Sequence, residues 1–99
     1  MAKFDVRQLR GEPTLVIDCQ ADFLSALDTR FVIPLMPADG LVVPSARLNP
    51  IVEFAEKKYA VYPQAAANVD TRELGKVLGS LAEYDLTIGN ALDMLISGF

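Results

Sequence analysis

Apolar residues follow one period in the early part of this 99-residue chain and another in its late part. Up to Tyr62 they alternate with polar residues or gather in runs too short for helices, which is typical of β-strands. These early runs cover residues 4–6, 14–20, 31–35, 51–54 and 59–62. After Asp70 the spacing becomes helical. The change of period predicts strands first and a helix last.

Two details refine the strand prediction. Pro34 lies inside the run 31–35 and has no N–H to donate, so we expect that strand to bulge or to lie at a sheet edge. The runs 51–54 and 59–62 flank the polar stretch "AEKK", which predicts a β-hairpin.

The late part of the chain predicts one helix. Periodicity alone extends it back to Arg72, but Gly75 and Gly79 weaken that first part. "SLAE", beginning at Ser80, fits a capping box. We therefore expect the helix to span about residues 81–96. The predicted fold is α+β: residues 1–99 form one domain, a small antiparallel β-barrel or curled sheet with one C-terminal helix.

The residue types present leave little room for catalysis. The chain has no histidine and one cysteine, which excludes His-based triads and cysteine zinc sites. No glycine-rich phosphate loop occurs. Cys19 lies in an apolar run and is expected to be a buried thiol. Carboxylates such as Asp18 and Asp22 are better explained by turns than by acid/base chemistry. We expect no catalytic residue, no metal site and no cofactor.

Composition indicates the kind of partner. The net charge of −4 argues against direct binding to DNA or RNA and favours a basic protein partner. The apolar share of 52% is high for a small monomer and favours a symmetric homodimer. Neither a signal peptide nor a membrane-spanning run is evident, so we expect a cytoplasmic protein.

Three features of the sequence are candidates for binding. Phe23 and Leu24 follow a strand and are either folded into the core or exposed as a pair. Asn90, Asp93 and Ser97 form the polar face of the predicted helix, which is commonly only solvated. Phe99 lies beyond the predicted helix end, where Gly98 can act as a left-handed cap.

Several segments together resemble the CcdB family of plasmid-maintenance and chromosomal toxins. They are "LVIDCQADFL" (15–24), "RFVIPL" (30–35), "LNPIVEF" (48–54) and "IGNALDMLISGF" (88–99). The resemblance spans nearly the whole chain. It implies a homodimer of non-enzymatic toxins with an SH3-like barrel core, an accessory sheet and a C-terminal helix. It also implies a strand near 71–74 in place of the helix that periodicity suggests there.

The resemblance further implies a function inside the bacterial cytoplasm. CcdB-like proteins are gyrase inhibitors of the topoisomerase-poison type: they bind the A subunit of DNA gyrase and trap the enzyme on cleaved DNA. A CcdA-like antitoxin neutralises them through a disordered segment that wraps the toxin dimer. The complex represses transcription of its own operon, with operator DNA contacted only by the antitoxin.

The family's gyrase-binding positions fall on particular residues of this sequence. They are Phe23, Leu24, Asp93, Ile96, Ser97, Gly98 and Phe99. At 97–99 the best-known family member has Trp-Gly-Ile, whereas this chain has Ser-Gly-Phe. A lost tryptophan is serious, because truncating such an interface anchor commonly costs at least ~2 kcal/mol.

Two alternatives remain open. Because of Ser97, one alternative is a CcdB-like protein with a lost or altered target in place of gyrase. The other alternative is a ribonuclease toxin of the MazF type, which shares the barrel. The acidic charge argues against a ribonuclease, and loss of RNA cleavage on changing Arg30 or Arg47 would support one.

Overall fold

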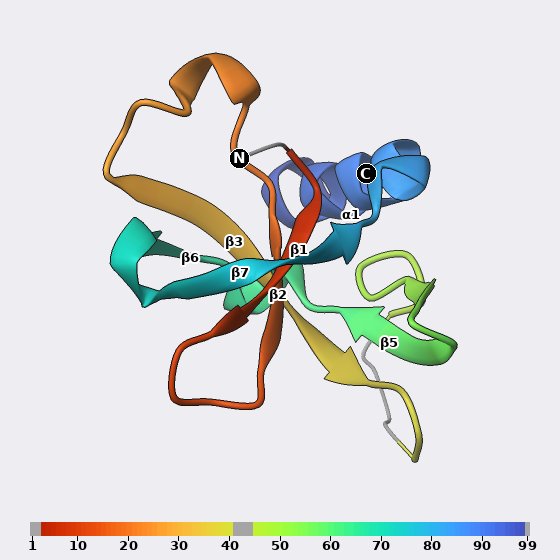
Figure 1. The fold of residues 1–99 in the computed structure, drawn as a ribbon. Helices are drawn as coiled ribbons and strands as arrows, with labels where there is room; N and C mark the ends of the chain where they lie inside the picture. Colours follow the sequence, from red (N-terminus) through yellow and green to blue (C-terminus); the bar gives the residue numbers. More distant parts are fainter. Residues whose placement is uncertain (1–2, 41–44, 99) are drawn as a thin grey trace.

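The computed structural model describes residues 3–40 and 45–98. A curled antiparallel sheet carries one C-terminal helix, α1 (Asp85–Ser97), as Figure 1 shows. The strands are β1 (Asp5–Leu9), β2 (Leu15–Asp18), β3 (Thr29–Pro37), β4 (Ile51–Phe54), β5 (Lys57–Val61), β6 (Ala67–Asp70) and β7 (Leu74–Ser80). Four 3₁₀ turns join them: η1 (Asp22–Leu24), η2 (Pro63–Ala65), η3 (Thr71–Glu73) and η4 (Ala82–Tyr84). The predicted α+β class, a curled antiparallel sheet with one C-terminal helix, is confirmed.

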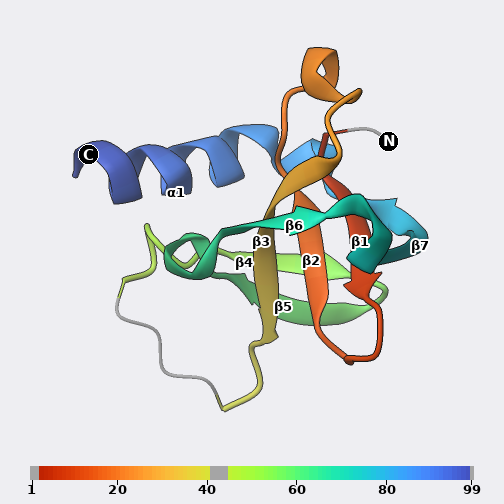
Figure 2. The ribbon, with the colours of Figure 1, turned by 90° about the vertical axis from the view of Figure 1, so that its left-hand side faces the viewer.

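The long strand β3 lies at the centre of the sheet. The described strands follow the order β4-β5-β3-β2-β1-β7, and β6 pairs with β3 as well. One edge of β3 pairs with β2, and the other pairs first with β6 and then with β5. Figure 2 shows how this arrangement curls the sheet around β3.

The strand that contains Pro34 was predicted to bulge or to lie at a sheet edge, and the prediction is wrong: β3 is central and its register with β2 has no shift. Pro34 lies opposite Val16 in the central strand. On the other edge, the β6 pairing ends at Val32 and the β5 pairing begins at Leu35. The proline therefore stands where β3 changes partner, and its carbonyl still accepts from the N–H of Tyr62 at 3.1 Å. A missing donor is tolerated at such a junction.

The predicted hairpin is confirmed, with a tighter turn than expected. Strand β5 begins at Lys57, so only Ala55 and Glu56 form the turn. Both have positive φ, 53° and 67°. Such angles match the right-handed twist of two paired strands, so a two-residue turn suffices.

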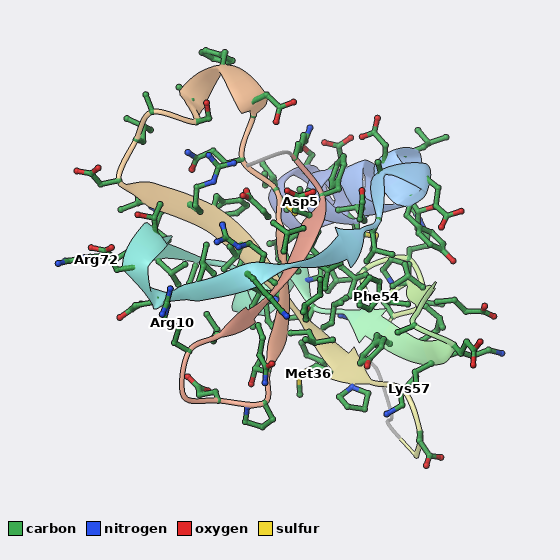
Figure 3. The ribbon with its side chains drawn as sticks, viewed as in Figure 1. Asp5, Arg10, Met36, Phe54, Lys57 and Arg72 are labelled. Carbon is green, nitrogen blue, oxygen red and sulfur yellow. The ribbon has the colours of Figure 1, made fainter. Side chains whose placement is uncertain are left out.

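The helical spacing from 74 to 82 was misleading. Residues 74–80 of that segment form β7, which pairs with β1. Two close approaches explain its glycines: a Cβ at Gly75 would lie 2.9 Å from the carbonyl oxygen of Gln8, and one at Gly79 would lie 2.6 Å from the ring of Phe54. Figure 3 shows the Phe54 side chain near β5. The strand expected near 71–74 starts only at Leu74, because 71–73 form η3.

The capping box at Ser80 is also wrong. Helix α1 starts at Asp85, not at 81, and its N-cap residue Tyr84 makes no side-chain cap hydrogen bond. The Ser80 hydroxyl accepts from the N–H of Ala82 at 3.1 Å, at the start of η4. Leu81 is buried in the core. Burial of that side chain fixes the chain before the helix, so a short 3₁₀ turn precedes the α-helix.

The main core lies between the curled sheet and the start of α1. Its buried members include Val6, Ile17, Ile33, Leu81 and Ile88. Cys19 belongs to the same cluster, which confirms the predicted buried thiol. The core therefore anchors α1 as far as Leu92 and leaves its last turn exposed.

Candidate protein-binding surface

The connection between β2 and β3 protrudes from the sheet. We call residues 21–28 the 21–28 loop; it contains η1 and returns to the sheet at Thr29. Phe23 at its tip is 86% exposed and Leu24 is 37% exposed. Of the two readings that the sequence left open, exposure of this pair is the one found. A large aromatic side chain in solvent is a candidate contact for a partner.

Local hydrogen bonds give the 21–28 loop its shape. The N–H groups of Leu24 and Ser25 donate to the carbonyls of Ala21 and Asp22, each at 3.0 Å. The side chain of Asp22 accepts from the backbone N–H of Lys3 at 2.7 Å. No residue of η1 is buried. The tip is therefore ordered by turn hydrogen bonds and by the contact of Asp22 with Lys3, rather than by burial of its side chains.

The base of the loop is a buried polar cluster. Asp18, Gln20 and Arg30 are all buried. Asp18 accepts from Nε of Arg30 at 2.8 Å and from the backbone N–H of Gln20 at 3.1 Å. Both Nη atoms of Arg30 lack a hydrogen-bond partner among the described residues. Sequence analysis did not predict that Asp18 pairs with Arg30 or that Gln20 joins them at the base of the loop.

The second exposed feature is the last turn of α1. Ile88 and Ala91 are buried, whereas Asp93, Ile96 and Ser97 face solvent, and Ile96 is 79% exposed. The predicted polar helix face at Asn90, Asp93 and Ser97 is thereby confirmed as solvated.

Gly98 ends the helix as predicted. It has φ of 79°, and its N–H donates to the carbonyl of Met94 at 2.9 Å. This is the left-handed C-cap for which glycine is suited. Phe99, the remaining position of the predicted site, lies outside the described residues.

The two exposed features lie apart on one chain. In Figures 1 and 2 the η1 turn (orange) and the C-terminal end of α1 (dark blue) are well separated. A helix of 13 residues is roughly 20 Å long, and its start lies near the core. The structure thus groups Phe23 with Leu24, and Asp93 with Ile96, Ser97 and Gly98.

A groove lined by Pro37, Lys57, Lys58 and Tyr59 contains none of the predicted site residues. Among residues 3–40 and 45–98, no three side chains of the metal-binding types cluster suitably for a metal ion. No helix in the described part of the chain is long and apolar enough to cross a membrane.

Two shifted pKa values are explained by local structure. Burial, together with the nearby charge of Asp18, raises the pKa of the Cys19 thiol from 9.0 to about 12. Hydrogen bonds from Arg72 lower the pKa of Asp70 from 3.8 to about 2. A thiol with a raised pKa is a poor nucleophile. The Asp70–Arg72 pair lies on the surface, where Arg72 projects outward in Figure 3.

The fold is that of a small β-barrel-like protein. Its exposed apolar side chains, Phe23, Leu24 and Ile96, are suited to binding a macromolecule. The family model described as CcdB protein matches residues 3–98, nearly the whole chain. The chain therefore belongs to the CcdB family, whose members are non-enzymatic toxins of toxin–antitoxin systems. No curated protein matches the sequence.

Proposed function

We propose that this toxin binds the A subunit of DNA gyrase and traps the enzyme on cleaved DNA. The observation that carries the proposal is the exposure of large apolar side chains at family binding positions: Phe23 on the 21–28 loop and Ile96 on α1. Burying one such side chain in a partner yields about 1.5–3 kcal/mol. Exposed apolar anchors of this kind are typical of interface hot spots.

The active unit is a homodimer. Within one chain the 21–28 loop and the end of α1 lie apart, so a continuous surface needs a second copy or a partner that spans both. Leu95 leaves further apolar area exposed on α1. A symmetric dimer uses the same patch twice and presents two copies of each anchor.

A CcdA-like antitoxin neutralises the toxin and carries the DNA contact of the pair. The toxin's net charge of −4 supports this division, because phosphate binding requires concentrated positive charge. Toxin activity and the repression of transcription then depend on different chains, and the toxin acts in the bacterial cytoplasm.

Ser97 favours a second candidate function, in which the target is lost or altered. The position is exposed on the last turn of α1, where a tryptophan would project from the surface. A serine there offers a hydroxyl and little contact area. The ribonuclease alternative is weaker still, because Arg30 is fully buried against Asp18 and is not accessible to RNA.

Expression without the antitoxin tests the gyrase proposal. We expect growth to stop in cells with ordinary gyrase and to continue in cells whose gyrase A subunit carries toxin-resistance substitutions. Pull-down of purified gyrase A subunit by the wild-type protein and by Ser97→Trp then separates the two candidates. Binding by both proteins supports gyrase poisoning, whereas binding by the substituted protein alone supports an altered target.

A further inference from the structure

Gln20 lies at the base of the 21–28 loop and has no assigned role in binding. Its side chain is buried, with 8% of the residue exposed. It follows Cys19 directly after β2, at the point where the chain leaves the sheet. A buried amide must find hydrogen-bond partners, so its contacts reveal what it holds.

The Gln20 amide bonds the backbone at three places. Its Nε2 donates to the carbonyl of Leu24 inside the loop and to the carbonyl of Thr29 at the loop's end, each at 3.1 Å. Its Oε1 accepts from the N–H of Phe31 in β3, also at 3.1 Å. Both amide hydrogens and one acceptor position are therefore used. The middle of the loop is tied to the strand that receives it.

The buried pair of Asp18 and Arg30 holds Gln20 itself in place. Its backbone N–H donates to Asp18, whose other carboxylate oxygen accepts from Arg30. Because this cluster is buried, alternative rotamers of Gln20 would leave polar atoms without hydrogen-bond partners, which is unfavourable. The cluster therefore fixes the amide in one orientation.

We infer that Gln20 is a positioning residue: it holds the 21–28 loop in the shape that presents Phe23 and Leu24 to the target. The inference rests on the proposed function, in which this pair contacts gyrase. No residue of η1 is buried, so packing does not order the tip. A preordered loop loses less conformational entropy on binding, so the toxin binds its partner more tightly.

An amide is the side chain that this geometry requires. In Gln20→Glu an acceptor oxygen replaces the Nε2 donor and faces the carbonyls of Leu24 and Thr29, while the contact to Phe31 persists. In Gln20→Met the length is kept and all three contacts are lost. Gln8→Glu is the matched control, because exposed Gln8 also donates to a loop carbonyl, that of Glu12, at 2.8 Å.

Hydrogen exchange in the free proteins tests the positioning itself. In the wild-type protein we expect both Nε2 protons of Gln20 to exchange at least tenfold more slowly than those of Gln8. In Gln20→Glu and Gln20→Met, backbone protection is lost at Ser25 and Leu27 and retained in β1 and β2. Rapid exchange of the wild-type Gln20 amide overturns the inference, even if neither variant folds.

A double-mutant cycle tests whether Gln20 acts through Phe23. We expect Gln20→Glu to weaken binding to purified gyrase A subunit about tenfold, and less than threefold further in a Phe23→Ala background. Gln8→Glu should leave binding unchanged. Equal losses in both backgrounds mean that Gln20 does not act by positioning Phe23.

Failure of the proposed function gives a different pattern. If the wild-type protein does not bind gyrase A subunit, or if Phe23→Ala binds equally well, the target or the contact is wrong. The exchange measurements then still decide whether Gln20 orders the loop.

Discussion

Arg30 and Asp18 form an ion pair in the interior: Nε of Arg30 lies 2.8 Å from Oδ2 of Asp18, and their side chains are 0% and 1% exposed. Asp18 ends β2 and Arg30 lies near the start of β3, so the pair joins the two strands between which the 21–28 loop protrudes. Moving a charged group from water into the interior costs on the order of several kcal/mol per ion. One hydrogen bond recovers only part of that desolvation cost. The pair thus fixes the base of the loop more than it stabilises the fold.

We predict that Arg30→Met lowers the free energy of unfolding by about 3–5 kcal/mol, because it leaves the Asp18 carboxylate buried without a partner. Asp18→Asn combined with Arg30→Met should recover part of that loss. Urea denaturation measures both effects. Arg72→Met is the control: it removes the exposed pair with Asp70 and should leave the urea midpoint unchanged. An equal loss in the single and double variants would contradict the prediction.

Much of the fold could be predicted from the sequence. The runs that became β2, β3 and β4 are short, apolar and bounded by turn residues, so local pattern and tertiary structure agree. Periodicity gave the wrong structure for residues 74–80, because Leu74, Val77 and Leu78, with Leu81 after them, have helical spacing by chance. The segment forms a strand because it pairs with β1. Gly75 and Gly79 have no side chain, which leaves room for Gln8 and Phe54. Such contacts join residues far apart in the sequence and leave no local signal.

The candidate site was only partly predictable. Exposure of Ser97 was predicted from the polar helix face that it shares with Asn90 and Asp93. Ile96 lies eight residues after buried Ile88, where helical spacing favours burial, so its exposure was not predicted. Gly98 has the sequence mark of a C-cap. The role of Gln20 could not be predicted, because its partners include Leu24, Thr29 and Phe31 through backbone atoms that any residue would supply. Side-chain pairs such as Asp18 with Arg30 need the three-dimensional register of β2 and β3.

We predict that alkaline pH destabilises the protein through Cys19. The folded-state pKa of about 12 lies above the ordinary 9.0. The contribution to stability is therefore complete below pH 9 and is lost between pH 9 and 12, where the unfolded chain ionises and the folded one does not. Urea denaturation at several pH values should show this slope in the wild-type protein, and a smaller one in Cys19→Ser. Equal slopes would show that Cys19 is not the cause.

Two glycines should respond oppositely to alanine. At Gly75 an added Cβ would lie 2.9 Å from the backbone oxygen of Gln8, so β1 and β7 must separate, which costs about 1–3 kcal/mol. At Gly89 nothing lies within 4 Å of an added Cβ, and the position is inside α1. Gly89→Ala should therefore raise stability by about 1 kcal/mol. Thermal unfolding of both variants measures the signs, and a stabilised Gly75→Ala would refute the crowding argument.

Binding to gyrase should depend on where an exposed apolar side chain lies. Phe23 is 86% exposed on the 21–28 loop, and Leu86 is 76% exposed at the start of α1, outside the predicted site. Phe23→Ala should weaken binding to gyrase A subunit at least about thirtyfold, because truncating an aromatic anchor costs about 2 kcal/mol or more. Leu86→Ala removes a side chain of similar exposure and should change binding less than about threefold. Isothermal titration calorimetry measures both, with circular dichroism to confirm folding. Equal losses for the two variants would mean that general surface hydrophobicity, not the 21–28 loop, governs binding.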